Sequence, residues 1–277
     1  MITSTREPQL PALAQGRSNV LGVGITPLNL DLACQALAEG ADCPGFTGFV
    51  TVTGVHGVVE SLRDEDLQRI HNRSFLSTPD GMPMVWVGRL NGFKHMDRVY
   101  GPDLMLDVFK MSEATGHRHF FFGGAEGVAS LLREKLAERY PKASVVDVYT
   151  PPFRPLTEEE EEALVERLDE HRPHFFWVGL STPKQEKFMS AFLEKYADRF
   201  ADWEHGLVML GVGAAFDFHS GRVVQAPRWI QRSGFEWLFR VCMDPKRLWK
   251  RYAVSNTVFL SRLLPAMMGL KKYPLKS

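Results

Sequence analysis

Three short segments of the chain combine residue types that can bind phosphates and move a proton. Residues 78–83 read Thr-Pro-Asp-Gly-Met-Pro and place Asp80 in a turn. Residues 178–186 read Val-Gly-Leu-Ser-Thr-Pro-Lys-Gln-Glu and contain Gln185. Residues 211–251 open with glycines and continue with a series of arginines and tryptophans. Because a carboxylate can serve as a general base and arginines can hold a diphosphate, these segments indicate chemistry on a phosphorylated substrate near an apolar surface.

The arginines of the third segment have helical spacing. Arg228 and Arg232 are four residues apart, and each can share a helix face with the other. The same spacing separates Arg247 from Arg251, and Arg240 lies between the two pairs. Two such pairs can hold a diphosphate. The tryptophans of this segment suit the core of a small helical region and an apolar–water interface equally well.

The charge of the chain is divided unevenly along its length. The 277 residues have a formal net charge of zero, yet from Arg222 onward 12 lysines and arginines stand against two acidic residues. Such a basic end indicates an anionic partner, either a membrane surface or a nucleic acid, although a solvated helix face has the same composition. The apolar run 253–270 contains Arg262 and Pro265, so we expect an interfacial helix rather than a spanning one.

Short apolar runs alternate with amphipathic helical patterns, which predicts an α/β fold. The expected strands are 20–25, 48–53, 119–122, 144–148, 174–179 and 207–212. The expected helices are 29–39, 58–71, 82–90, 102–115, 125–140, 157–172 and 183–196. Buried strands that alternate with helices indicate a Rossmann-like parallel sheet covered by helices on both faces. Ligands of such sheets bind at the carboxyl ends of the strands, and each of the three segments follows or contains such an end.

The domain organisation expected from these patterns has three parts. Residues 1–18 have the composition of a disordered lead-in, residues 19–221 form the Rossmann-like domain, and residues 222–277 form a basic helical C-terminal appendage. The five glutamates at 158–162 follow Thr157, so we interpret them as the first turns of a capped helix rather than as an acidic binding tract.

In this order along residues 20–251, the three segments resemble the WecG/TagA/CpsF family of bacterial glycosyltransferases. The resemblance implies transfer of a hexose from a UDP-sugar donor to a polyprenyl-diphosphate-linked sugar acceptor during surface-polysaccharide synthesis. It also implies a cytoplasmic enzyme attached peripherally to the anionic inner face of the cell membrane, with the appendage completing the active site. No cofactor and no nucleic-acid partner are expected, and a homo-oligomer is compatible with the sequence.

Four positions match active-site residues of that family. Asp80 matches the proposed catalytic base, although its local sequence also suits a helix cap. Thr53 matches an active-site threonine, with Thr51 as the alternative, because the family's Thr-x-Asn pattern is replaced here by Thr-Gly-Val. Gln185 matches an active-site glutamine that can hydrogen-bond a sugar hydroxyl or developing charge. Arg98 matches an arginine that can stabilise the departing phosphate.

Further residues are candidates for substrate binding. His56 can carry a proton, hydrogen-bond the nucleotide or simply start a helix. Gly123 and Gly124 join a strand to a helix, where glycines allow close approach to a phosphate and also serve packing. Gly213 and Asp217 follow another strand and are expected to contact the nucleotide.

The departing diphosphate is expected to be held by arginines instead of a metal ion. The cations assigned to it besides Arg98 are Arg228, Arg232, Arg240 and Arg247. The acidic run at 64–66 reads as a surface turn before a helix, and the three cysteines lack Cys-x-x-Cys spacing, so no metal site is expected. Lys184 and Glu186 are interpreted as surface or helix-cap groups. The resemblance implies an inverting transfer, and these residues make the expected transfer metal-independent.

Other functions are compatible with parts of this pattern. The altered Thr-Gly-Val run is consistent with a catalytically inactive, nucleotide-binding scaffold of polysaccharide assembly. A dinucleotide-dependent oxidoreductase requires a glycine fingerprint in the first strand–helix turn, which residues 23–27 do not supply. A nucleic-acid binder is disfavoured because the basic segment lacks a recognised reading motif. The sugar transferred, N-acetylmannosamine, glucose or a related hexose, is not determined by the sequence.

Overall fold

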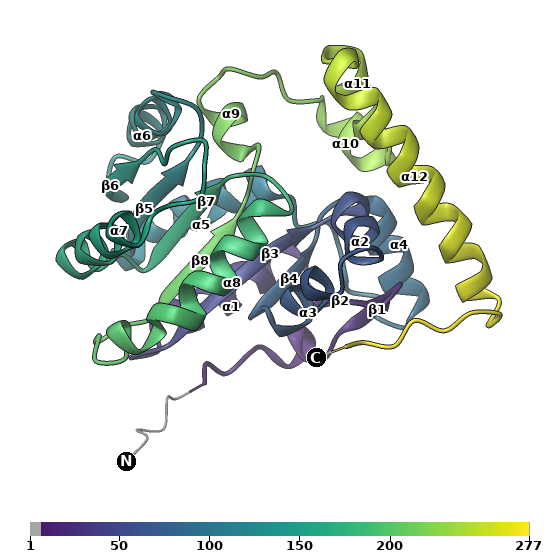
Figure 1. The fold of residues 1–277 in the computed structure, drawn as a ribbon, viewed down its shortest axis with the longest axis horizontal. Coiled ribbons are helices and arrows are strands. Elements are labelled where there is room, and N and C mark those ends of the chain that lie inside the picture. Colours follow the sequence, from purple (N-terminus) through teal and green to yellow (C-terminus); the bar gives the residue numbers. More distant parts are fainter. Residues whose placement is uncertain (1–6, 277) are drawn as a thin grey trace. The chain divides into compact units, whose positions relative to one another are not determined.

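The computed structural model describes residues 7–276 as alternating strands and helices (Figure 1). Its strands are β1 (Ser18–Val20), β2 (Val23–Ile25), β3 (Thr47–Thr53), β4 (Leu76–Pro79), β5 (Arg118–Gly123), β6 (Ser144–Tyr149), β7 (Phe175–Gly179) and β8 (Leu207–Gly211). Its helices up to the last strand are α1 (Leu30–Ala41), α2 (Val55–Ser61), α3 (Glu65–Arg73), α4 (Met82–Leu90), α5 (Gly101–Thr115), α6 (Val128–Arg139), α7 (Glu158–His171) and α8 (Lys184–Tyr196). The helices after β8 are α9 (Ala215–His219), α10 (Arg228–Ser233), α11 (Glu236–Met243) and α12 (Pro245–Met267). Two short 3₁₀ helices span Ala12–Ala14 and Ala197–Phe200.

Six strands form one sheet in the order β4-β3-β8-β7-β5-β6. The β5–β6, β5–β7 and β7–β8 pairs are parallel, which confirms the expected α/β class. The prediction of one strand over residues 20–25 was wrong. Leu21 and Gly22 both have positive φ angles, 54° and 91°, and this two-residue turn folds the segment into the separate antiparallel β1–β2 hairpin.

The chain divides into two compact units. The first comprises Cys34–Val50 and Gly101–Val223 with the described residues up to Pro11, and the second comprises Ala12–Ala33, Thr51–Tyr100 and the described residues from Val224 onward. The expected division at residues 221 and 222 lies near the change of unit after Val223. The expected domain 19–221 is shared between the two units, because the C-terminal helices pack with early parts of the chain. The expected three-part organisation stays a prediction, and residues 1–6 of the expected lead-in lie outside the described chain.

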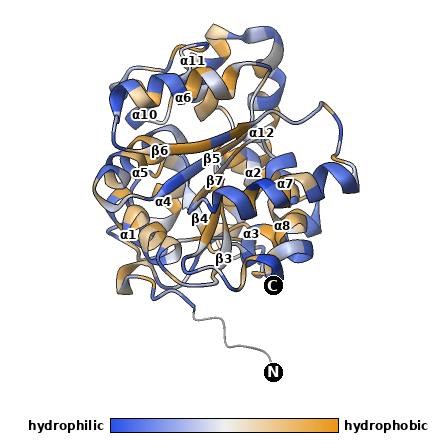
Figure 2. Ribbon diagram, turned by 90° about the vertical axis from the view of Figure 1, so that its left-hand side faces the viewer, coloured by the Kyte–Doolittle hydropathy of each residue, from blue (hydrophilic) through white to orange (hydrophobic). Residues whose placement is uncertain are grey.

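In the first unit, helices lie on both faces of the parallel strands. Figure 2 shows α5 and α6 on one side of these strands and α7 and α8 on the other, as right-handed crossovers require when the strand order reverses. The strands between them carry aromatic side chains that are fully buried. Trp177 of β7 has no exposed surface, and its indole nitrogen donates to His119 Nδ1 of β5 at 3.0 Å.

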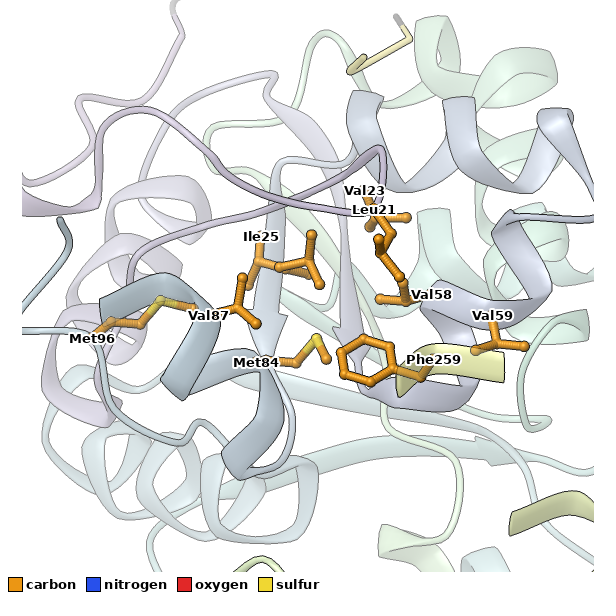
Figure 3. Packing of buried hydrophobic residues seen from close by; sticks show 10 residues of the cluster. Leu21, Val23, Ile25, Val58, Val59, Met84, Val87, Met96 and Phe259 are labelled. Carbon is orange, nitrogen blue, oxygen red and sulfur yellow. The ribbon is translucent and has the colours of Figure 1, made fainter. Parts of the chain in front are cut away.

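In the second unit, the hairpin, α2, α4 and the C-terminal helix α12 share one hydrophobic core. Figure 3 shows Phe259 of α12 among side chains from these elements, and only 2% of its surface is exposed. Its neighbours in the core include Val58 and Val59 of α2 and Met84 of α4. Truncating a buried phenylalanine typically costs 3–5 kcal/mol. Helix α12 is therefore part of the core of this unit.

Two local predictions can be compared directly with the elements. The acidic run follows Thr157 as the start of α7, where Thr157 Oγ1 accepts from the Glu160 amide and Glu160 Oε2 accepts from the Thr157 amide, so the capped-helix interpretation is confirmed. The single helix expected over 58–71 is instead two helices, because Asp64 caps α3 through the Leu67 amide and interrupts the first helix.

One strand was not predicted. β4 reads Leu-Ser-Thr-Pro, which is too polar to stand out as a buried strand, yet all four residues are buried. Its hydroxyls have partners within the second unit: Ser77 Oγ lies 2.9 Å from Thr53 Oγ1. This short strand matters because it leads directly to Asp80.

Candidate active site

Asp80 lies immediately after β4, and the start of α2 packs against it. The Asp80 amide donates to the carbonyl oxygen of Thr53 at 3.0 Å. A Cβ atom on Gly54, the N-cap of α2, would stand 2.9 Å from the Asp80 carbonyl oxygen and 3.5 Å from Asp80 Oδ2. The N-cap of the following helix α4 is Gly81, and no side-chain capping hydrogen bond is made there. Asp80 is therefore the residue before the N-cap of α4, and its interpretations as a catalytic base and as a helix cap both stay predictions.

Two tyrosines and a half-buried arginine interact electrostatically with Asp80. Burial raises the pKa of Tyr100 well above its ordinary value, and the negative charges of Glu236 and Asp80 raise it further. Burial likewise raises the pKa of Tyr252. Burial alone lowers the pKa of Arg240, but the two tyrosines, Glu236 and Asp80 together raise it. At neutral pH Asp80 therefore interacts electrostatically with a permanent cation and with two neutral hydroxyl groups.

Thr53 is buried, and its hydroxyl belongs to an internal polar network. Thr53 Oγ1 lies 3.0 Å from Thr51 Oγ1, 2.9 Å from Ser77 Oγ and 3.1 Å from His71 Nδ1. Burial, with a smaller contribution from Arg17, lowers the pKa of His71 to about 4, so the imidazole is neutral. Both candidate threonines belong to this network, and the main chain of Thr53 is what holds Asp80. A direct substrate contact by either hydroxyl stays a prediction.

His56, on α2, is linked to α12. Its Nδ1 lies 3.3 Å from Ser255 Oγ. Burial, followed by the charges of Arg251 and Arg63, lowers the pKa of His56 to about 4. The imidazole is neutral at pH 7, so its 3.9 Å approach to Glu60 is not an ion pair. This position favours the structural interpretation of His56 over proton transfer.

Arg98 is engaged by protein groups of the second unit. Its Nη2 donates to Glu236 Oε2, and its Nη1 donates to Gln231 Oε1 at 3.3 Å. The guanidinium lies over the Tyr100 ring, 4.0 Å from the centroid. The Val99 amide next to it donates to the Pro79 carbonyl, so this loop is anchored to the end of β4. Direct binding of a diphosphate by Arg98 stays a prediction.

The other predicted arginines lie on the C-terminal helices. Arg228 and Arg232 are exposed on α10, and Arg240 is half-buried on α11. Arg247 belongs to α12, but its side chain lies outside the described part of the chain. Trp229 is 73% exposed, so it does not anchor a core.

In the first unit, the structure fixes which way the Gln185 amide points. Its Nε2 lies 2.9 Å from the Gly211 carbonyl oxygen and 3.2 Å from Glu186 Oε1. Both neighbours accept hydrogen bonds, so this end must be the NH₂ group. Oε1 is buried and has no partner among the described residues, and it faces the position where a Cβ on Gly213 would lie, 3.5 Å away. Gln185 therefore presents an acceptor and not a donor.

The interpretation of Glu186 as a surface or cap group was wrong. Its side chain has no exposed surface, and Oε1 accepts from Thr182 Oγ1 at 2.8 Å as well as from Gln185. A carboxylate of this kind is buried only when it is hydrogen-bonded. Glu186 therefore helps to orient the amide of Gln185.

The glycines at the strand ends of this unit have packing roles. A Cβ on Gly123 would stand 2.7 Å from the Gly179 carbonyl oxygen, and one on Gly124 would meet Val128 at 3.1 Å. Gly213 has a φ of 50°. The carbonyl of Asp217, in α9, accepts from the Arg222 and Val223 amides, which ends that short helix. Contacts of these residues with a nucleotide stay predictions.

Sequence reasoning missed three groups that belong to the same set of electrostatic interactions as Asp80: Tyr100, Glu236 and Tyr252. Glu236 carried a usable signal, because it is one of only two acidic residues in the basic segment from Arg222 onward. A lone acid among cations is expected to pair with one of them. The tyrosines carried no such signal, since nothing in their spacing relates them to Asp80.

Comparison with known proteins identifies the family of this chain. The model of the glycosyl transferase WecG/TagA/CpsF family matches residues 18–273. Among similar proteins are two named N-acetylglucosaminyldiphosphoundecaprenol N-acetyl-beta-D-mannosaminyltransferase, one from Bacillus subtilis strain 168 and one from Staphylococcus aureus strain MRSA252. The first is 25% identical over 69% of this chain and 69% of its own length, and the second is 24% identical over 63% of each. The family match covers nearly the whole chain, and the chain therefore belongs to the WecG/TagA/CpsF family of glycosyl transferases.

Proposed function

We propose that this protein transfers a hexose from a UDP-sugar to a sugar linked to a polyprenyl diphosphate, with inversion at the anomeric carbon and without a metal ion. The hexose is N-acetylmannosamine in the names of the relatives, and glucose or another hexose remains open for this chain. The observation that carries the proposal is the placement of Asp80 after β4, against the start of α2 and in the electrostatic field of Arg240.

Asp80 would act as the general base. It removes the proton from the acceptor hydroxyl while the oxygen attacks the anomeric carbon and the bond to the diphosphate breaks. The electron pair of that bond leaves with the diphosphate, where a neighbouring cation stabilises the charge. Arg240 is suited to this because its pKa is raised above the ordinary value and it stays charged at any physiological pH. The exposed Arg228 and Arg232 are further candidates for the same diphosphate.

Gln185 would accept a hydrogen bond from the substrate. Its free position is an oxygen, so the matching group is a hydroxyl or an N–H and not a phosphate oxygen. This narrows the sequence-based expectation, in which the amide was free to serve either a hydroxyl or a developing negative charge.

Inversion fits the use of one base. A single displacement inverts the anomeric centre and needs only one carboxylate to activate the attacking hydroxyl. The relatives are named for a beta-linked product, which a single displacement on an alpha-linked donor would give.

Metal independence is supported by the interactions of the acidic residues 64–66, which all have partners within the protein. Asp64 caps α3, Glu65 pairs with Lys276, and Asp66 pairs with Arg69 at 2.7 Å. These carboxylates already have partners within the second unit. Arginines of the C-terminal helices would take the place of a divalent ion beside the diphosphate.

Attachment to an anionic membrane is proposed for the C-terminal helices. No helix in the described range 7–276 is long and apolar enough to span a membrane. Figure 2 shows hydrophobic and hydrophilic stretches side by side on α10 and α11. Trp229 and Trp249 are 73% and 57% exposed, beside several lysines and arginines, which is the composition of an interfacial surface. Because Phe259 of α12 is in the core, this surface is better tested by substitution than by truncation.

A donor and acceptor screen tests the proposed function. UDP release is measured with UDP-N-acetylmannosamine, UDP-N-acetylglucosamine and UDP-glucose, each with and without a short-chain lipid-diphosphate N-acetylglucosamine acceptor. We expect acceptor-dependent release with one donor, and loss of that release in Asp80→Asn. If UDP binds but no donor gives acceptor-dependent release, the transferase assignment fails and the inactive scaffold is the better description.

A further inference from the structure

Glu236 lies between two arginines in the second unit. It is the first residue of α11, and its Oε2 accepts from Arg98 Nη2. The two side chains are only 14% and 10% exposed. Arg240 follows Glu236 by four residues, so both can lie on one face of α11, and Glu236 contributes to the raised pKa of Arg240. The Glu236 carboxylate therefore interacts with two cations: Arg98, in the loop after α4, and Arg240, on its own helix.

The guanidinium of Arg98 interacts with side chains of the protein itself. Nη1 and Nη2 donate to Gln231 and Glu236, and the flat face of the group lies on the Tyr100 ring. Nε has no partner among the described residues, but it is buried, so a ligand does not reach it without movement of the chain. An arginine that holds a diphosphate directs its paired nitrogens at the phosphate oxygens. In Arg98 those nitrogens are directed at α10 and α11.

We propose that Glu236 and Arg98 are positioning residues: their ion pair fixes the start of α11 and with it the position of Arg240 one turn later, and Arg98 does not bind the diphosphate itself. This role rests on the proposed function. Its physical basis is the cost of leaving a charge without its partner in a poorly exposed position. Removing one partner of such an ion pair destabilises a protein much more than removing both together. Loss of the pair lets α11 move, and the cation that stabilises the leaving group moves with it.

The test is a double-mutant cycle with Arg98→Gln and Glu236→Gln. If the pair positions Arg240, each single variant lowers kcat by about 30-fold with the donor KM within about threefold, since binding is less sensitive than transition-state placement. The double variant then loses no more than the worse single one. If Arg98 holds the diphosphate directly, the two losses multiply, the affinity for UDP falls at least tenfold in Arg98→Gln alone, and the proposal is overturned.

A charge reversal gives a second readout. Arg98→Glu combined with Glu236→Arg should recover at least tenfold of the activity lost in Arg98→Glu alone, because the ion pair is restored with opposite polarity. A phosphate ligand cannot be replaced by a glutamate, so a reversed pair that folds but stays as inactive as Arg98→Glu overturns the proposal. The cycle of neutral variants decides the question if the reversed pair does not fold. Arg69→Gln, which breaks an exposed ion pair with Asp66 in the same unit, is the matched control and should leave kcat unchanged.

Failure of the proposed function would be seen separately. The same cycle measured on thermal unfolding without substrate reports whether the Arg98–Glu236 pair is coupled, whatever reaction the protein catalyses. Coupled stability with no transferase activity in the wild type refutes the transferase role and with it the positioning role. Uncoupled stability in an active wild type refutes the positioning pair alone.

Discussion

Gly54→Ala should lower activity by displacing Asp80, although Gly54 itself has no proposed part in the reaction. Gly54 has φ −111° and ψ −171°, an extended conformation that alanine also adopts, so the backbone itself is not strained. The added Cβ would stand 2.9 Å from the Asp80 carbonyl oxygen, whereas ordinary contacts begin at 3.4 Å. The carbonyl must therefore retreat by about 0.5 Å, and the carboxylate moves with it.

The size of the effect follows from this displacement. A misplacement of about 1 Å can cost on the order of 100-fold in rate, so about half of that shift should cost about tenfold in kcat. The affinity for UDP should stay within about twofold, because the diphosphate is assigned to arginines on other elements. The free energy of unfolding should fall by about 1 kcal/mol or less, since the carbonyl lies at the end of a strand and can move.

Gly57→Ala is the matched control, three residues further along and inside α2, the helix that begins after Gly54. Its Cβ would meet His71 Nε2 and Thr53 Cγ2 at 3.5 Å, which is ordinary contact. Replacing a helical glycine by alanine should stabilise the protein by up to about 1 kcal/mol and leave kcat unchanged. Steady-state UDP release, isothermal titration with UDP and thermal unfolding measure the three quantities. Wild-type kcat in a folded Gly54→Ala protein would show that the position of Asp80 does not limit the reaction, and the base assignment would then be refuted.

Four further outcomes are expected. Asp80→Asn should lower kcat by about 100-fold or more while the affinity for UDP stays near the wild-type value. Near-normal turnover in this variant would refute the assignment of Asp80 as the general base. Chelation with EDTA should leave the rate within about twofold, whereas a Lewis-acid metal is worth several kcal/mol; a rate that collapses and returns with Mg²⁺ would contradict this. Acidification from pH 7 to pH 5 should reduce the free energy of unfolding by about 2 kcal/mol for each of His56 and His71, because their pKa values, lowered from 6.5 to about 4, let only the unfolded chain take up protons in this range. The stability they contribute is complete above pH 6.5 and lost as pH falls toward 4, so melting midpoints that do not change would refute it. Replacing Leu260 and Leu264 of α12, which are 54% and 58% exposed, by serine should release the protein from anionic liposomes while activity on a soluble acceptor persists, and unchanged co-sedimentation would exclude these two side chains of α12 from the proposed membrane contact.

Local patterns in the sequence determined much of the architecture. The alternation of apolar runs and helical segments gave the α/β class, because each burial pattern depends on neighbours within a few residues. Thr157 followed by Glu160 specified the start of α7 for the same reason. Asp80 and Gln185 stood out because their segments resemble the motifs of the family, and each segment lies at a predicted turn or strand end.

The tertiary structure decided which partners the polar side chains have. Glu236 is 138 positions from Arg98, and no local periodicity relates the two, so only the path of the chain brings them together. Glu186 looked like a surface residue because helix periodicity does not show that the glutamate of this first turn meets Thr182. The hydroxyl of Thr53 is turned toward His71 by the pleat of β3 and by β4, a strand too polar to be read from its residues. Burial patterns are local and can be read from sequence, whereas the partner of a polar group depends on which distant segments fold beside it.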